Sequence, residues 1–247
     1  MGLRFWLVTL AALAAAVTTG MLGAWQLSRA AEKQAMQADI DARAQMPALG
    51  NGDLLQLQPG DLGAVLHRKV VLQGQWLPEA MVYLDNRQMQ GKPGFWVLAP
   101  LRLSGGQAVV LVQRGWVPRD FQERTRLPQV QTPATQVQLQ GRVTDHVVRL
   151  YEFGPSAGGD REARIRQNLD VAAYAAETGL PLLPLVVLQT DVASDGLRRD
   201  WAPVNTGVDK HYGYAFQWFG LCALVIVLYV WFQFVRRFSR RGAKSRA

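Results

Sequence analysis

The sequence HYGYAFQWFGLCALVIVLYVWFQFV, from His211 to Val235, contains no formal charge and decides the architecture of this protein. As a helix, these 25 residues span roughly 38 Å at 1.5 Å per residue, against a membrane hydrocarbon core of about 30 Å. A second uncharged run of 24 residues, Phe5 to Ser28, lies between Arg4 and Arg29. The sequence therefore predicts two transmembrane helices with a large region between them.

The positive charge of the chain is concentrated after the second run. A formal net charge of +8 is typical of nucleic-acid-binding proteins. However, all 19 Asp and Glu lie between Glu32 and Asp209 together with 20 of the 27 Lys and Arg, and six basic residues follow Val235. A basic cluster directly after an apolar helix indicates a cytoplasmic end, so both termini are expected in the cytoplasm and no nucleic acid is expected as a partner. Arg29 and Lys33 argue weakly for the opposite orientation, but long loops translocate largely regardless of such charges.

These patterns divide the chain into five regions: a cytoplasmic N-terminus (1–4), a first transmembrane helix (5–28), a periplasmic β-rich domain (29–210), a second transmembrane helix (211–235) and a basic cytoplasmic tail (236–247). The first run could instead be a cleaved signal peptide, with small residues at 14–16 near a cleavage site. A retained anchor is favoured, because the apolar part of a signal peptide has roughly 7 to 15 residues. The sequence before Phe5 leaves no room for a transit peptide, which favours a bacterial inner membrane over an imported mitochondrial protein.

The region between the runs is expected to be mainly β. Alternating, β-branched or aromatic runs separated by Gly and Pro predict strands at 69–76, 81–85, 95–99, 108–112, 137–143 and 185–188, with turns at 91–94 and 104–106. Asp170 as N-cap and Gly179 as stop predict one short helix over 171–178, and a helical pattern continues from Ala30 to Met46, ended by Pro47 and the Gly-rich 50–52. Residues 154–159 are expected to form a loop. The predicted fold class is therefore an α+β membrane protein, in which two transmembrane helices flank a mainly antiparallel β-sheet or small barrel outside the cytoplasm.

Small residues recur every four positions in the first run, at Ala12, Ala16, Gly20 and Ala24. This spacing places them on one helical face, along which another helix could approach closely. The alternative is that alanine is simply common in membrane helices.

Candidate catalytic and zinc sites are not apparent. There is no nucleophile elbow, phosphate-binding loop or paired-histidine motif. One cysteine, Cys222, and three histidines nearly exclude a structural zinc site and exclude a disulfide within the chain. His67 and the pair Asp145-His146 are interpreted as surface residues.

His211 is the informative histidine, because aromatic residues follow it at helical spacing. On a helix it shares a face with Tyr214, Ala215, Trp218, Phe219 and Cys222. A neutral imidazole can ligate haem iron, and aromatic side chains beside it can cover a macrocycle. The alternative is an interfacial histidine in an aromatic belt, and the residues alone favour this alternative.

Four segments together resemble the surfeit locus protein 1 family of cytochrome c oxidase assembly factors. They are Leu22 to Arg29, Asn86-Arg87 with Gly91 to Leu101, Val112 to Pro118, and His211 to Phe219. The resemblance covers the chain in order, with 50–66 and 119–136 matching poorly. Gln113 and Asp209-Lys210 stand where the family often has Asn, and the second departure could alter how His211 is held.

The resemblance implies a protein without enzymatic activity that matures the haem-bearing subunit of cytochrome c oxidase. Such a protein would receive haem a transiently from haem a synthase, with His211 as the ligand of the haem iron. The further cofactor contacts are then expected at Tyr214, Trp218, Phe219, Trp25 and Arg29, and charge makes Arg29, Arg114 or Lys210 candidate partners of the haem propionates. The Arg114-Gly115-Trp116 segment itself is interpreted as structural, since Gly permits a bend and Trp buries apolar area.

Two other functions stay open. A haem-free membrane scaffold could stabilise the nascent oxidase subunit. A membrane-anchored sensor is disfavoured, because the tail after Val235 has only 12 residues.

Overall fold

The computed structural model describes residues 2–58, 60–123, 126–151, 164–202 and 207–235. The chain divides into two compact units, residues 1–39 with 203–247 and residues 40–202. The loop predicted at 154–159 and the basic tail lie outside the described residues.

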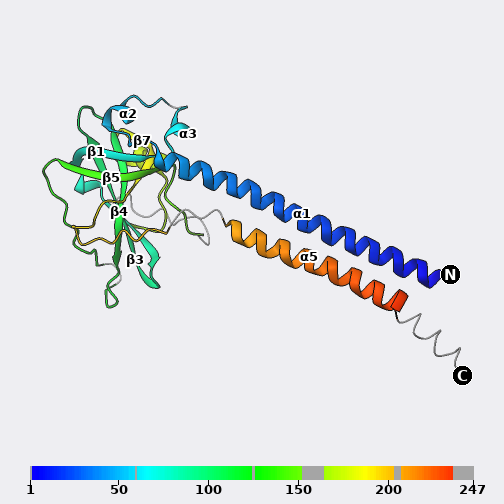
Figure 1. Ribbon diagram of the computed structural model, residues 1–247. Coiled ribbons are helices and arrows are strands. Elements are labelled where there is room, and N and C mark those ends of the chain that lie inside the picture. Colours follow the sequence, from blue (N-terminus) through cyan, green and yellow to red (C-terminus); the bar gives the residue numbers. More distant parts are fainter. Residues whose placement is uncertain (1, 59, 124–125, 152–163, 203–206, 236–247) are drawn as a thin grey trace, which may run out of the picture. The chain divides into compact units, whose positions relative to one another are not determined.

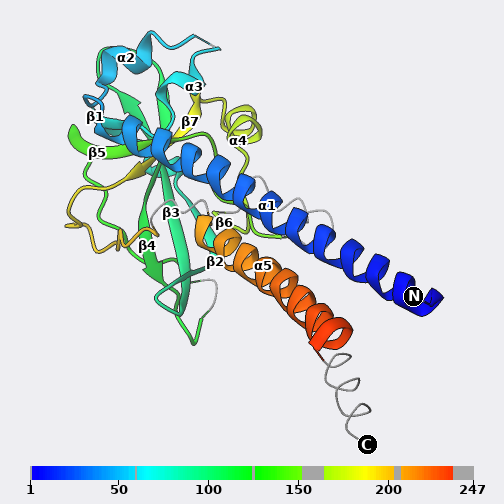
Figure 2. The same ribbon diagram turned by 45° about the vertical axis from the view of Figure 1, so that its right-hand side comes forward.

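The first unit contains one long helix and most of a second. Helix α1 (Leu3–Gln45) is continuous for 43 residues, and helix α5 (Val208–Val230) runs into a π-helical turn, η2 (Trp231–Val235). Among the described residues, these two helices are long and apolar enough to cross a membrane. Figures 1 and 2 both show α5 alongside the N-terminal part of α1. The continuation of α1 beyond Arg29 confirms the predicted helical extension, which ends just before Pro47.

The second unit is a β-barrel with added strands. Its described strands are β1 (Lys69–Trp76), β2 (Val82–Met89), β3 (Lys92–Leu103), β4 (Val109–Pro118), β5 (Val137–Thr144), β6 (Ile165–Arg166) and β7 (Leu182–Gln189). Their order is β1-β5-β7-β4-β3-β2-β6, and β1 also pairs with β3, which closes β1, β5, β7, β4 and β3 into a five-stranded barrel (Figure 1). The β4–β7 and β2–β6 pairs are parallel and the others are antiparallel. The predicted fold class is confirmed, with the barrel as the form that the domain takes.

Barrel closure requires a close approach of two strands at Gly74. A Cβ at this position would lie 2.3 Å from the carbonyl oxygen of Arg102 on β3, so only glycine fits. Inside the closed barrel, buried side chains such as Leu72, Phe95 and Val112 form the larger apolar core.

The predicted short helix, α4 (Val171–Thr178), covers part of the outer face. The side chain of Asp170 accepts a hydrogen bond from the backbone N–H of Ala173, and Gly179 ends the helix with φ +68°. Tyr174 of α4 packs in a second apolar cluster with Leu84, Leu111 and others. Strand β4 is therefore covered on both faces, and its residues from Val109 to Trp116 are all buried.

Several local predictions are wrong in detail. Strand β3 runs through Pro93 and Pro100, and β7 runs through Pro184. A proline lacks an N–H but its carbonyl still accepts hydrogen bonds. For example, the N–H of Leu77 donates to the carbonyl oxygen of Pro100 at 3.0 Å. The turn predicted at 91–94 is confined to Gln90 and Gly91. Three short elements were not predicted: α2 (Asn51–Leu55), α3 (Leu62–Val65) and β6, while Pro78–Ala80 forms a single 3-10 turn, η1.

His67 is half-buried rather than a simple surface residue. It has φ +64°, and its N–H bonds the carbonyl oxygen of Val143 at 3.0 Å. Asp145 and His146, by contrast, are exposed as predicted, with their side chains 2.5 Å apart.

Candidate functional site

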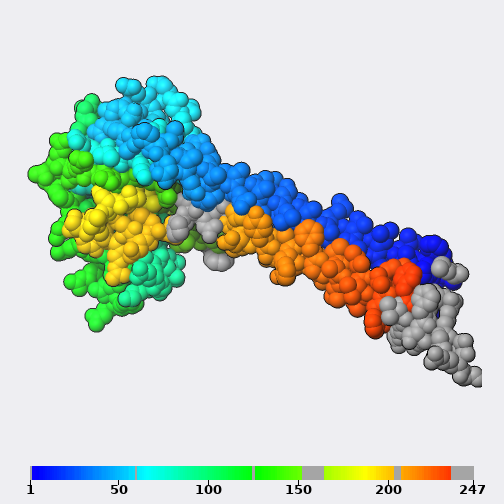
Figure 3. Space-filling model, in the orientation of Figure 1, coloured from blue at the N-terminus to red at the C-terminus, as the bar shows by residue number. Residues whose placement is uncertain are grey.

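Helices α1 and α5 pack along a seam in which less exposed residues alternate at spacings of four and three. On α1 the seam comprises Phe5, Thr9, Ala12, Ala16, Thr19, Gly23, Gln26 and Ala30, and on α5 it comprises His211, Ala215, Trp218, Cys222, Val225 and Tyr229. Figure 3 shows the blue atoms of α1 and the orange atoms of α5 in contact along the pair. A mean spacing of 3.5 residues is the period of left-handed helix pairs.

Three polar contacts cross this seam. The hydroxyls of Thr9 and Tyr229 share a hydrogen bond of 2.9 Å, the Cys222 thiol donates to the carbonyl oxygen of Ala16 at 3.3 Å, and Nδ1 of His211 lies 2.8 Å from Oε1 of Gln26. Low numbers on α1 meet high numbers on α5, so the helices are antiparallel. The C-terminal end of the first predicted transmembrane segment and the N-terminal end of the second therefore lie together, where Gln26 and His211 meet.

The contact between Gln26 and His211 determines which imidazole nitrogen is available. An amide oxygen only accepts hydrogen bonds, so Nδ1 of His211 donates its proton to Gln26. Nε2 of the neutral imidazole then carries the lone pair. This is the arrangement found around metal-binding histidines, which donate their second ring N–H to a fixed acceptor.

Of the other predicted cofactor contacts, Trp218 lies in the seam, and Phe219, which is 41% exposed, contacts α1 beside it. Trp218 is half-buried one heptad after His211. The ring of Phe219 packs over Gly23, where a Cβ would lie 2.8 Å from its ring carbons. The structure thus brings His211, Trp218 and Phe219 to the side of α5 that meets α1.

The remaining three predicted contacts are exposed. Tyr214 and Trp25 are 52% and 53% exposed, and the Arg29 guanidinium lies 5.9 Å from the centre of the Trp25 ring. Nη1 of Arg29 also forms an ion pair of 2.6 Å with Glu32. These residues lie outside the seam and are available to a ligand rather than committed to helix packing.

Gln26 lies within the segment from Leu22 to Arg29, and the sequence alone predicts no role for it. The sequence does contain a signal for this contact, because Gln26 near the end of the first uncharged run and His211 at the start of the second are expected on the same side of the membrane. What the sequence does not show is that both residues occupy the seam.

Arg114, another candidate partner of the haem propionates, is buried. Its side chain is 2% exposed in the barrel domain, where Nη2 lies 3.0 Å from Oδ2 of Asp195 and the guanidinium stacks on Trp76 at 4.6 Å. Burial lowers the pKa of Arg114, and Asp195 opposes this effect. The structural interpretation of this motif is therefore confirmed, and the idea that Arg114 pairs a haem propionate is not supported.

Arg87 and Trp116, from two of the motifs, also hold the domain together. The buried Trp116 donates its indole N–H to the carbonyl oxygen of Arg87 at 2.8 Å. The guanidinium of Arg87 donates to the carbonyl oxygens of Val148 and Gln167, each at 2.8 Å, and stacks on Trp96. Burial lowers the pKa of Arg87 to about 10.

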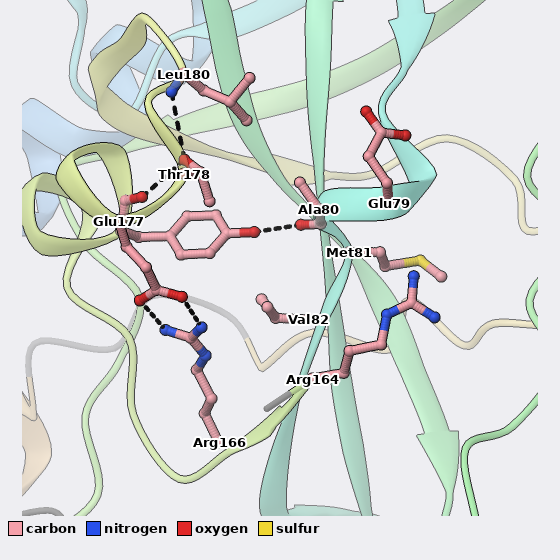
Figure 4. Close-up of a pocket in the computed structure, with 10 residues that line it drawn as sticks. Glu79, Ala80, Met81, Val82, Arg164, Arg166, Glu177, Thr178 and Leu180 are labelled. Carbon is pink, nitrogen blue, oxygen red and sulfur yellow. Dashed lines mark hydrogen bonds and ion pairs between the residues drawn. The ribbon is translucent and has the colours of Figure 1, made fainter. Parts of the chain in front are cut away.

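The barrel domain also has a pocket of about 360 Å³ between α4 and strands β2 and β6 (Figure 4). Its polar groups are largely satisfied by one another: Arg166 pairs with Glu177, and the Tyr174 hydroxyl donates to the carbonyl oxygen of Ala80. Burial raises the pKa of Tyr174 to about 12, and the Glu177 carboxylate raises that of Arg166. No histidine or cysteine is among the described residues that line this pocket, so it offers no imidazole or thiolate to a haem iron.

Comparison with known proteins gives a consistent family match. A model of the SURF1 family matches residues 13–223. A SURF1-like protein of Rickettsia felis is 27% identical over 216 residues, covering 85% of this chain and 89% of the relative. A SURF1-like protein of Drosophila melanogaster is 27% identical over 243 residues (89% and 75%), and one of Mycobacterium tuberculosis is 27% identical over 233 residues (91% and 82%).

Proposed function

The chain belongs to the SURF1 family, generally one of cytochrome oxidase assembly factors, and from this we propose that it binds haem a and delivers it to the haem-bearing subunit of a haem-copper oxidase. Haem a would be received from haem a synthase and held only transiently. Handing over a cofactor needs an exchangeable ligand, which an axial imidazole provides, so no enzymatic step is included in the proposal.

The observation that carries the proposal is the hydrogen bond between His211 and Gln26. Because Nδ1 donates to Gln26, Nε2 is the ring nitrogen of His211 that would bind a haem iron. Trp218 and Phe219 would contact the macrocycle from α5, and Tyr214 and Trp25 offer further exposed aromatic surface. Arg29, already near Trp25, would pair a propionate in place of Glu32.

The proposed location is a bacterial inner membrane, with the lipid bilayer around α1 and α5. The basic tail supports cytoplasmic termini, and the barrel domain would then lie in the periplasm. The charge distribution gives no support to a nucleic-acid partner.

The test is to purify the full-length protein from cells that make haem a, as wild type and as His211→Ala. The optical spectrum of the wild type should show bound haem a, and His211→Ala should lose most of it. His146→Ala is the matched control, because this histidine is exposed, pairs with its neighbour Asp145 and belongs to the barrel domain. Equal haem content in wild type and His211→Ala would remove His211 from the ligand role.

A haem-free scaffold is the second candidate. It is favoured by large apolar side chains on α5 that point away from α1, such as Phe216, which is 81% exposed. Such a surface could contact a nascent membrane subunit as well as lipid. Haem-free protein that still co-purifies with the oxidase subunit would support this function.

A further inference from the structure

Gln26 is an unusual residue in the helix pair. Among the described residues of α1 and α5, it is the only buried side chain that carries a polar group, with 9% of its surface exposed. Removing an amide from water is unfavourable unless it is hydrogen-bonded. Its Oε1 meets this condition through Nδ1 of His211, a residue 185 positions away.

The surroundings of this contact are built from small residues. Gly23 and Ala30 are the seam neighbours of Gln26 on α1, and Ala215 is the seam neighbour of His211 on α5. All three are buried. Small neighbours leave room for two larger polar side chains to meet between helices that are closely packed.

The chemistry of the acceptor sets the properties of the imidazole. A carboxylate at this position would draw the Nδ1 proton strongly and make Nε2 a stronger electron donor, as in carboxylate–histidine pairs at metal sites. It would also place a charge in an apolar seam, which is costly. An amide orients the ring without adding charge, and so leaves a ligand of moderate strength.

We propose that Gln26 is the positioning residue that holds His211 with Nε2 free for haem iron and keeps it a moderate, exchangeable ligand. The inference rests on the haem-binding function proposed above. It predicts that Gln26 acts on haem through His211 alone.

The test compares Gln26→Leu, Gln26→Glu and Thr9→Val in the full-length protein, by titration with haem a in detergent. Gln26→Leu should weaken haem affinity about 10- to 100-fold, the usual effect of losing an outer hydrogen-bond partner of a metal ligand. Gln26→Glu should keep the affinity for ferrous haem a, bind ferric haem a more tightly and so shift the haem reduction potential to a more negative value, because the stronger donor stabilises the ferric state. Thr9→Val is the matched control, since it removes another inter-helix hydrogen bond, to Tyr229, without touching His211.

A second set of measurements separates this inference from the haem-binding proposal itself. In a His211→Ala background, Gln26→Leu should cause no further loss of affinity. If His211→Ala binds haem a as the wild type does, the proposed function fails. Two other outcomes would show that the positioning role of Gln26 is wrong while the proposed function stands. In the first, His211→Ala loses haem but Gln26→Leu and Gln26→Glu keep wild-type affinity and potential. In the second, Thr9→Val weakens binding as much as Gln26→Leu.

Discussion

Asp195 is the shared partner of two buried guanidinium groups in the barrel domain. Its Oδ2 lies 3.0 Å from Nη2 of Arg114 and 2.6 Å from Nη2 of Arg199, whose side chains are only 2% and 6% exposed. Arg199 also donates from Nε to the carbonyl oxygen of Arg114 at 2.7 Å. Asp195 therefore compensates buried positive charge on β4 and on the segment after β7.

Replacing Asp195 by Asn should destabilise the protein strongly. Breaking a buried ion pair leaves uncompensated charge and costs about 3–5 kcal/mol in the free energy of unfolding. Glu32→Gln, which breaks the exposed pair with Arg29, should change that free energy by less than about 1 kcal/mol. Thermal unfolding of both full-length variants, followed by near-ultraviolet circular dichroism, gives the comparison. Equal unfolding midpoints for the two variants would show that the buried pair is not a stabilising feature.

The charge of a residue does not by itself show whether that residue can pair with a haem propionate. Arg29 and Arg114 are equivalent in the sequence as candidate partners of propionates, yet Arg114 is enclosed in the barrel domain and Arg29 is exposed beside Trp25. Burial separates the two residues, and burial depends on contacts with residues distant in the sequence.

At the scale of secondary-structure elements, the helix pair follows a different spacing from the predicted one. The stripe of small residues at every fourth position includes Ala12 and Ala16, which lie on the seam, but also Ala24, which is exposed. Gly23 takes the corresponding seam position. A four-residue spacing drifts around the helix, whereas the alternation of four and three keeps one face toward the partner.

The packing of the two helices can be tested with the native cysteine. A Cβ at Gly20 would lie 3.8 Å from Sγ of Cys222, within reach of a disulfide, so Gly20→Cys should form an intramolecular disulfide upon mild oxidation in membranes. Ala24→Cys, on the exposed face, should not. Counting free thiols by maleimide labelling and mass spectrometry distinguishes the two. Failure of Gly20→Cys to crosslink, or equal crosslinking of Ala24→Cys, would contradict the described packing of α1 against α5.

At the scale of the whole molecule, the barrel connects strands in an order that differs from their order in the sequence. Strand β7 inserts between β5 and β4, and β1 closes on β3. The positions and types of most strands followed from local patterns, but their neighbours did not, because alternation indicates which side is buried and does not identify the partner strand.

The proposed topology predicts different labelling of the domain and the tail. In a Cys222→Ser background, a cysteine in place of Val192, which is 92% exposed in the barrel domain, should react with an impermeant maleimide added to spheroplasts. A cysteine in place of Ser245 should react only after lysis, since positive charge retains the tail in the cytoplasm. The reverse pattern would invert the proposed orientation.

The sequence by itself determined the two apolar helices, most strands and the helix between Asp170 and Gly179, and it identified His211 as the candidate ligand. These follow from run length, periodicity and capping residues, which act within a few positions of the chain. Only the tertiary structure decided the closure of the barrel, the burial of Arg114 and the pairing of His211 with Gln26. Each of these depends on which faces of distant segments meet, and that depends on packing of the whole chain rather than on any local pattern.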